Sequence, residues 1–520
     1  MHAIAVLPAT WAGHLWLAAL VAFPFIGLGL SPLFDLDEGA FTASTAEMFM
    51  RDDFMSSYLL GEPRHDKPIL IYWLQAASVQ LLGTSEFAWR LPSALASAAW
   101  IFLTYAFVRR AGHPASGAST ALVAALVVAT AAGLSVITRA ATADALLNLW
   151  LASAGYASWL WLGEGKKRWL YAAWLAMALG FLTKGPVALV IPGGAVFLWC
   201  MSRMQWRRFL AWVFAPGPLL LFAAVASPWY IAQTIHEGTG FLSGFFLKHN
   251  LSRFDAPMEG HGGNYLYYVP VVLLSLLPHT GLFLLALGRL RRLWDDALLR
   301  FGLLWFALAF VLFSFSGTKL PHYVYYGYGG LVIVLARVAA ELRERPLDRW
   351  LVGLPAVAMF ALLLSLPALL HAAVPRLKLD DQALLGNLAA AFGAGYWLFC
   401  GAALAVTLFM LFMRRPGPGA VLHVQGMLAG LALAVWLIPI VGEVQQGPVR
   451  NAARIARQLD GPLLLYGINT PSFQTYAGRP VRRRPPMTGD IVLSRETRLP
   501  RDVEYEVLYR ERSYVLLRVR

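Results

Sequence analysis

The sequence predicts an all-α polytopic membrane protein that carries a small α/β domain at its C-terminal end. Of its 520 residues, 58% are hydrophobic and only 14% are charged, and the mean hydropathy is +0.58. Apolar runs of spanning length recur along the chain, and the usual length of about twenty residues gives about thirteen helices. After Val441 the composition changes to short apolar runs separated by turn residues. A soluble globular protein does not have this profile.

The expected spans follow one another from the start of the chain to Val441. They lie at residues 11–30, 87–108, 115–137, 143–162, 168–184, 186–201, 208–231, 264–288, 299–315, 320–340, 350–371, 384–413 and 420–441. We interpret the first as a retained helix, because it has no basic leader and no clear small-residue cleavage site. These residues make up a membrane domain, 1–441.

Basic residues gather in alternate loops between these spans. They are Arg109 and Arg110, Lys166 to Arg168, Arg203 with Arg207 and Arg208, Arg289 with Arg291 and Arg292, Arg343 with Arg345 and Arg349, and Arg414 with Arg415. The positive-inside rule places these loops and the N-terminus in the cytoplasm, and the other loops and the C-terminal domain outside. Because topology explains much of the net charge of +14, nucleic acid is excluded as a partner.

The second domain is predicted at residues 442–520. A short helix is expected at 450–459, and strands at 462–466, 490–493, 504–509 and 514–518. The two cysteines lie in apolar segments without CxxC spacing, so neither a disulfide framework nor a zinc finger is implied.

The first long polar interruption, residues 31–73, is the main candidate for chemistry. It crowds acidic residues around Arg64, His65 and Lys67, and functional residues gather on loops held by a rigid scaffold. Residues 40–50 and 69–82 can form two helices too short to cross a bilayer, so we expect them to lie along the interface.

Charged residues inside or beside apolar spans are the next candidates, because such charges usually face a cavity or a partner. Asp144, Lys184 and Lys319 are of this kind. Basic groups there suit a phosphate in a partly dry cavity, and the basic residues that can line it also include Arg90, Lys67, Arg253 and His322. For Arg90 and Arg139 a snorkelling or helix-capping role is the favoured alternative.

A second outer loop brings further polar residues together between Gln233 and Gly263. It contains His249, Asn250, Arg253 and His261. With His65 and Asp66, His249 and His261 can make a divalent-metal site, although loop histidines more often serve as hydrogen-bonded scaffolding.

Seven segments together resemble the lipid-linked-sugar glycosyltransferases of the GT-C class, and most closely the bacterial aminoarabinose transferases and the related protein O-mannosyltransferases. They are DEGAF (37–41), HDKPILIYW (65–73), FAWRLPSAL (87–95), LTKGP (182–186), HNLSRF (249–254), GTKLPHYV (317–324) and NTPSFQTYAGRPV (469–481). The resemblance implies the GT-C fold with juxtamembrane interfacial helices, in the bacterial inner membrane with a periplasmic active site.

The resemblance also implies transfer of a sugar, with 4-amino-4-deoxy-L-arabinose as lead candidate, from undecaprenyl phosphate to lipid A or another envelope acceptor. The implied reaction inverts the anomeric configuration, and the enzyme is expected to be a monomer in contact with membrane lipids. Catalysis is expected from Asp37, with Glu38 as its neighbour or substitute. Donor-phosphate or lipid contacts are expected from Lys67, Arg64, Lys184, Arg253, Lys319, His322 and Tyr323, and substrate-pocket contacts from Asp144, Arg90, His249 and Asn250. The chain departs from the family pattern at Ala40, where an arginine is common, at Asp66 and at Asn250.

Two alternatives remain open at this stage. One is an enzyme like the protein O-mannosyltransferases, and the other is a transporter or flippase in which Asp144 and Lys184 serve ion coupling. Asp37→Asn separates enzyme from transporter, because a transporter is expected to be indifferent to a charge outside its core.

Overall fold

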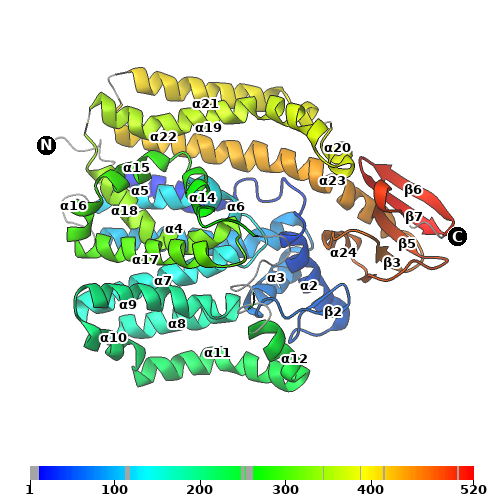
Figure 1. The fold of residues 1–520 in the computed structure, drawn as a ribbon, viewed down its shortest axis with the longest axis horizontal. Helices are drawn as coiled ribbons and strands as arrows, with labels where there is room; N and C mark the ends of the chain where they lie inside the picture. The colour runs from blue at the N-terminus through cyan, green and yellow to red at the C-terminus, as the bar shows by residue number, and fades with distance from the viewer. Residues whose placement is uncertain are drawn as a thin grey trace.

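The computed structural model describes residues 11–111, 117–246, 252, 262–343, 345–386, 388–413, 416–499 and 503–520. Figure 1 shows a bundle of roughly parallel helices with a sheet at one end. Within these ranges, seven helices are long and apolar enough to cross a membrane by length and composition. The chain is therefore a mostly helical, multi-span membrane protein with a C-terminal mixed sheet.

The bundle has helices along most of each predicted run, but the runs at 115–137, 208–231 and 384–413 are each divided between two helices. Its helices are α1 (Trp11–Ala22), α4 (Glu86–Ala111), α5 (Gly117–Thr130), α6 (Ala132–Ile137), α7 (Asp144–Glu164), α8 (Lys167–Lys184), α9 (Val187–Ser202), α10 (Trp206–Val213), α11 (Pro216–Glu237), α12 (Thr239–Leu242), α14 (Tyr268–Ser275), α15 (Thr280–Gly288), α16 (Leu290–Asp295), α17 (Ala297–Phe315), the 3-10 helix η4 (Pro321–Gly327), α18 (Tyr328–Ala340), α19 (Pro346–Ala373), α20 (Leu379–Leu385), α21 (Ala394–Phe412), α22 (Pro418–Leu431) and α23 (Ile438–Ala456). The run at 264–288 is interrupted near Pro278, which has no N–H to donate.

Two short helices lie between α1 and α4 and confirm the helices predicted in the first polar loop. They are α2 (Asp37–Arg51) and α3 (Leu70–Leu82), and a small hairpin of β1 (Tyr58–Leu59) and β2 (Glu62–Pro63) separates them. With 13 residues, α3 is too short to span a bilayer. Leu81 and Leu82 at its end are exposed. A helix of this length with an apolar exposed end suits an interfacial position.

Several basic loops gather at the end of the bundle opposite the sheet. Figure 1 places α10 and α16 at this end, and α2, α3 and the sheet at the other. Ion pairs join neighbouring loops here, with Arg110 2.6 Å from Glu164 and Arg292 3.5 Å from Glu341. The charge separation used for the topology prediction is therefore also a separation in space.

The last helix does not end where the composition changes. Together with α22 and the π-helical turn Ala432–Leu437, α23 makes one helical segment that runs to Ala456. The separate helix predicted at 450–459 was therefore wrong, and most of that segment is the last part of α23. The predicted boundary at 441/442 falls inside this helix, which continues through Gly447 and Pro448.

The C-terminal sheet has the strand order β4-β3-β5-β7-β6. Its strands are β3 (Leu463–Leu465), β4 (Val481–Arg482), β5 (Ile491–Arg495), β6 (Tyr505–Glu511) and β7 (Tyr514–Val519). Strand β3 pairs in parallel with β4 and β5, whereas β7 pairs antiparallel with β5 and β6. Four of the strands confirm the predicted ones, and β4 was missed because it has only two residues.

The short helix α24 (Ser472–Ala477) docks the sheet domain onto α2. The hydroxyls of Thr475 and Thr42 are 3.0 Å apart, and the backbone N–H of Ser472 donates to the Asp35 carboxylate at 2.9 Å. Gly39 makes this close approach possible, since a methyl group there would collide with Asp35. The docking places the sheet domain beside the start of α2.

Candidate active site

Asp37 and Glu38 begin α2, and the structure gives these adjacent carboxylates opposite surroundings. Glu38 is 2% exposed. Its two oxygens accept hydrogen bonds from Nε and Nη2 of Arg90, both at 2.7 Å, and from the backbone N–H groups of Phe34 and Ala141. Asp37 is exposed, and no hydrogen bond or ion pair joins it to another residue in the described part of the chain. Only Asp37 has a carboxylate available to a ligand.

Arg90 uses every guanidinium N–H to hold the segment before α2. Besides Glu38, it donates to the carbonyls of Leu28, Ser31 and Pro32 at 2.6–3.0 Å. A guanidinium has five N–H donors, and all five are satisfied here. Arg90 lines the cavity described next, but its hydrogen bonds position the loop. Arg90 neither snorkels nor caps a helix, and its direct contact with substrate stays a prediction.

Asp37 lies on a cavity of about 550 Å³. Apolar side chains form most of its wall, and they include Leu28, Val136, Ile137, Leu320, Leu437, Ile438 and Val441. Asp144 from α7 and His322 from η4 also line it. A mostly apolar cavity with a few convergent polar groups is the usual form of a small-molecule or lipid site. The fold therefore brings together three residues that are far apart in the sequence.

Asp144 anchors a buried polar cluster at the edge of this cavity. Its Oδ1 accepts from Lys184 Nζ at 2.6 Å and from the Tyr326 hydroxyl at 2.9 Å, and it lies 3.6 Å from Nε2 of His322. The Lys184 ammonium also lies 5.5 Å from the centre of the Tyr323 ring. A carboxylate with such partners stays charged despite its burial, and it holds Lys184 in a fixed place.

Arg64, Asp66 and Lys67 form a second charged group beside α2. Asp66 accepts from Arg64 at 3.3 Å and from Lys67 at 2.8 Å, and Arg64 also donates to the carbonyl of Ala40 at 2.6 Å. The Arg64 guanidinium therefore lies beside position 40, where the glycosyltransferases that the sequence resembles often have an arginine. The charge of Asp37 acts on both Arg64 and His322, and that of Lys67 acts on His322. The two charged groups thus lie within electrostatic range of each other.

Lys319 and Tyr323 are both buried, near η4. The Lys319 ammonium donates to the carbonyl of Ser316. Tyr323 packs against Phe313 and stands edge-on to His322, with ring centres 5.0 and 4.9 Å apart. Neither lines the cavity directly. Tyr323 lies against His322, where it can shape the polar end of the cavity.

The remaining site predictions fall partly outside the described residues. Four of the predicted residues lie outside the described ranges, namely His249, Asn250, Arg253 and His261. Of the other proposed metal ligands, His65 pairs with Glu237, and Asp66 is held between Arg64 and Lys67. The described residues contain no group of three or more His, Cys, Asp or Glu side chains placed to hold a metal. The metal site stays a prediction.

Sequence reasoning missed three partners of residues in or beside the predicted site. Tyr326 belongs to the tyrosine-rich run 323–328, which was a usable signal for a buried polar cluster. Glu237 ends α11, and Ser472 lies in the sheet domain, 437 positions from Asp35. Local sequence carries no signal for contacts between such distant residues.

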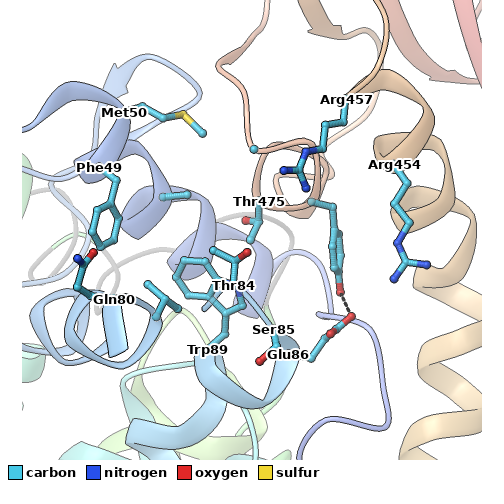
Figure 2. Close-up of a pocket in the computed structure, with 14 residues that line it drawn as sticks. Phe49, Met50, Gln80, Thr84, Ser85, Glu86, Trp89, Arg454, Arg457 and Thr475 are labelled. Carbon is cyan, nitrogen blue, oxygen red and sulfur yellow. Dashed lines mark hydrogen bonds between the residues drawn. The ribbon is translucent and has the colours of Figure 1, made fainter. Parts of the chain in front are cut away.

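A further cavity of about 570 Å³ lies between α2, α3, the start of α4, α23 and α24. Figure 2 shows Phe49, Trp89, Arg454 and Arg457 around it. The hydroxyl of Tyr476, which also lines this cavity, is hydrogen-bonded to Oε1 of Glu86 at 3.2 Å. None of the predicted site residues lines this cavity. The cavity beside Asp37, which is of similar size, therefore remains the candidate reaction site.

The chain is similar to known membrane glycosyltransferases along most of its length. Residues 66–231 match the family described as dolichyl-phosphate-mannose-protein mannosyltransferase. The undecaprenyl phosphate-alpha-4-amino-4-deoxy-L-arabinose arabinosyl transferase of Edwardsiella ictaluri is 31% identical over 375 residues, which cover 68% of this chain and 66% of the relative, just under two thirds. The enzyme of the same name from Pseudomonas aeruginosa is 28% identical over 83% of this chain and 72% of its own length.

The fold is also that of a solved structure. The crystal structure of ArnT from Cupriavidus metallidurans bound to undecaprenyl phosphate matches with a TM-score of 0.77, at 20% identity, over 98% of both chains. This likeness covers the helical bundle and the C-terminal sheet together.

Proposed function

The chain belongs to the ArnT-like family of membrane glycosyltransferases that use polyprenyl-phosphate sugar donors, and from this premise we propose its reaction. The enzyme transfers 4-amino-4-deoxy-L-arabinose, or a related pentose or hexose, from undecaprenyl phosphate to lipid A or another cell-envelope acceptor. The observation that carries this proposal is the cavity itself, where Asp37 lies on an apolar space that can receive a polyprenyl chain.

The donor phosphate fits the polar end of this cavity. Breaking the bond between the anomeric carbon and the phosphate oxygen leaves an extra negative charge on the polyprenyl phosphate. Lys184, held by Asp144, and Lys67 both lie within electrostatic range of His322, which lines the cavity, and they can stabilise that charge. Preorganised cations of this kind typically give the largest catalytic contribution.

Asp37 acts on the acceptor. If the acceptor is a hydroxyl, Asp37 takes its proton as the oxygen attacks the anomeric carbon. If it is a phosphate, which is already ionised, Asp37 orients the acceptor or the sugar. A single displacement inverts the anomeric configuration, and the configuration of the product tests this point.

The remaining features of the proposal concern the membrane. We propose about thirteen spans, by the length criterion, with the basic loops in the cytoplasm. The active site and the domain at 442–520 then face the periplasm of a bacterial inner membrane, and the protein acts as a monomer.

A protein acceptor is the second candidate. The match of residues 66–231 to a family described as protein mannosyltransferases favours it. The transporter alternative has no such support, because the family is one of enzymes.

Transfer by the purified protein tests the proposal. Protein in nanodiscs is given a panel of undecaprenyl-phosphate sugars with lipid A or an unfolded protein, and the acceptor mass is followed. We expect a gain of one sugar residue on lipid A, and its loss in Asp37→Asn. The control is Asp52→Asn, an exposed carboxylate that follows the other end of α2. A mass gain on protein alone would favour the second candidate, and no transfer from any donor would refute the proposal.

A further inference from the structure

The cavity of Figure 2 is not used by the proposed reaction. Its volume of about 570 Å³ is in the range of sites for small ligands. Residues of α2, α3 and the start of α4 line one side, and residues of α23 and α24 line the other. It shares no lining residue with the cavity beside Asp37. A group bound inside it therefore does not contact Asp37.

The side formed by α2, α3 and α4 is mostly apolar. Its apolar lining residues are Ala46, Phe49, Met50, Val79 and Trp89. The chain next to this lining also exposes large apolar side chains, namely Leu81, Leu82 and Phe87. Exposed apolar surface of this kind, at the end of a helix that suits an interfacial position, fits contact with acyl chains.

The opposite side of the cavity carries positive charge. Arg454 and Arg457, at the end of α23, are both exposed and both line the cavity (Figure 2). No hydrogen bond or ion pair joins either guanidinium to another residue in the part of the chain that the structure describes. Glu86 is the one carboxylate among the lining residues, and its Oε1 accepts from the Tyr476 hydroxyl at 3.2 Å. The cavity therefore has two positive charges against one negative charge.

The two sides together fit an amphipathic anion. Guanidinium groups bind phosphate through paired N–H donors, and basic residues at a membrane surface attract anionic lipid head groups. Gln80 and Thr84, which are exposed and line the same cavity, can form hydrogen bonds with the polar part of a head group. A small soluble anion leaves the apolar side uncovered, and a neutral lipid leaves the arginine charge unbalanced.

We propose that this cavity binds an anionic glycerophospholipid of the surrounding membrane, with its phosphate at Arg454 and Arg457 and its acyl chains along α3. Because both the membrane domain and the sheet domain line the cavity, the bound lipid stabilises their docking. The lipid is a structural ligand and is not consumed. The inference is therefore independent of the proposed function.

Binding of a short-chain lipid to the full chain tests the proposal. Protein in neutral detergent is titrated with dioctanoyl phosphatidylglycerol, bound lipid is counted by native mass spectrometry, and the Tm is measured. We expect the wild type to bind it more tightly than dioctanoyl phosphatidylcholine, with a rise in Tm. Arg454→Gln and Arg457→Gln should each weaken binding about fivefold. Equal binding of the two lipids by the wild type, or undiminished binding by both variants, overturns the proposal.

A matched pair of double variants separates the site from general charge attraction. Arg454→Gln with Arg457→Gln and Arg510→Gln with Arg520→Gln each remove two exposed positive charges from the C-terminal part of the chain. Arg510 and Arg520 do not line the cavity and pair with nearby glutamates, at 3.1 and 3.2 Å. Exposed pairs contribute little to stability, so the control should stay folded and bind phosphatidylglycerol as the wild type does. Equal losses in the two double variants overturn the site.

Two further probes identify other occupants. Glycerol 3-phosphate carries the anion without acyl chains, and we expect it to bind far more weakly than the lipid. Equal affinity, lost in the double variant at Arg454 and Arg457, would assign the cavity to a soluble phosphate compound and overturn the proposal. Lipid A is expected not to displace phosphatidylglycerol, and displacement would make this an acceptor site instead. None of these measurements needs sugar transfer, so a failure of the proposed function leaves the inference standing.

Discussion

Asp37 and Glu38 are neighbours in the chain, and their difference shows how the site is divided. Glu38 is buried, paired with Arg90 and bonded to two backbone N–H groups, whereas Asp37 faces the apolar cavity without a partner among the described residues. Burying a carboxylate requires full satisfaction of its oxygens, and the satisfied group cannot then act on a ligand. One residue therefore fixes the start of α2, and the other is left to react.

The largest expected effect is the loss of turnover in Asp37→Asn. Removing a general base or orienting carboxylate lowers kcat by about 10²–10⁴-fold. The Tm is expected to stay unchanged, because Asp37 makes no hydrogen bond to any residue that the structure describes. Single-turnover transfer and thermal unfolding, measured on the same sample, check both points. A fall in Tm large enough to explain the loss of activity would contradict the assignment of Asp37 to the reaction and Glu38 to the fold.

Glu38→Gln is expected to have the opposite pattern. It leaves the Arg90 charge buried beside a neutral amide, and breaking a buried ion pair in this way costs about 3–5 kcal/mol. The variant should unfold at lower temperature in detergent, and its activity should fall only as the folded fraction falls. Arg110→Gln is the matched control, because its partner Glu164 lies at the exposed, basic end of the bundle and such pairs contribute less than about 1 kcal/mol.

Tyr326→Phe tests whether Asp144 positions other residues, as Glu38 does, or takes part in the reaction, as Asp37 does. The change removes the hydrogen bond from Tyr326 to Asp144 and the one from Lys184 to Tyr326, and it leaves the ion pair between Lys184 and Asp144. We expect the KM for the donor to rise about three- to tenfold, the equivalent of roughly 1 kcal/mol, with kcat nearly unchanged. A fall in kcat at constant KM would instead place the Asp144 cluster in the chemical step.

The smallest expected effect concerns Asp35 and the pH. Burial raises the pKa of Asp35 to about 7, against the opposing hydrogen bonds from Ser472. A carboxyl with a raised pKa contributes stability that is fully present below its ordinary value of 3.8 and is lost as the pH rises through about 7. Asp35→Asn should therefore raise the Tm at pH 8 by a few degrees at most and change it little at pH 4. Equal shifts at both pH values would contradict the raised pKa.

The sequence predicted the class of the fold and most of its elements for simple reasons. Apolar runs of spanning length have few soluble alternatives, and short alternating runs after residue 460 indicated β3, β5, β6 and β7. The strand β4 and the helix α24 were missed because both are short. The continuation of α23 through the predicted boundary was missed because helix propensity does not reveal a change of surroundings.

For the site, the sequence alone determined which residue types can do the chemistry: two acidic residues at the start of α2, and charges such as Asp144, Lys184 and Lys319 in apolar segments. Only the tertiary structure decided their roles. It gave the Glu38 carboxylate hydrogen-bond partners and left the Asp37 carboxylate available to a ligand. It also placed Lys184 against Asp144 and Tyr326, and it brought the sheet domain to Asp35. Local sequence sets the cost of burying a charge, but the partner that offsets this cost lies tens to hundreds of residues away. Which of two adjacent carboxylates stays available was therefore fixed by packing.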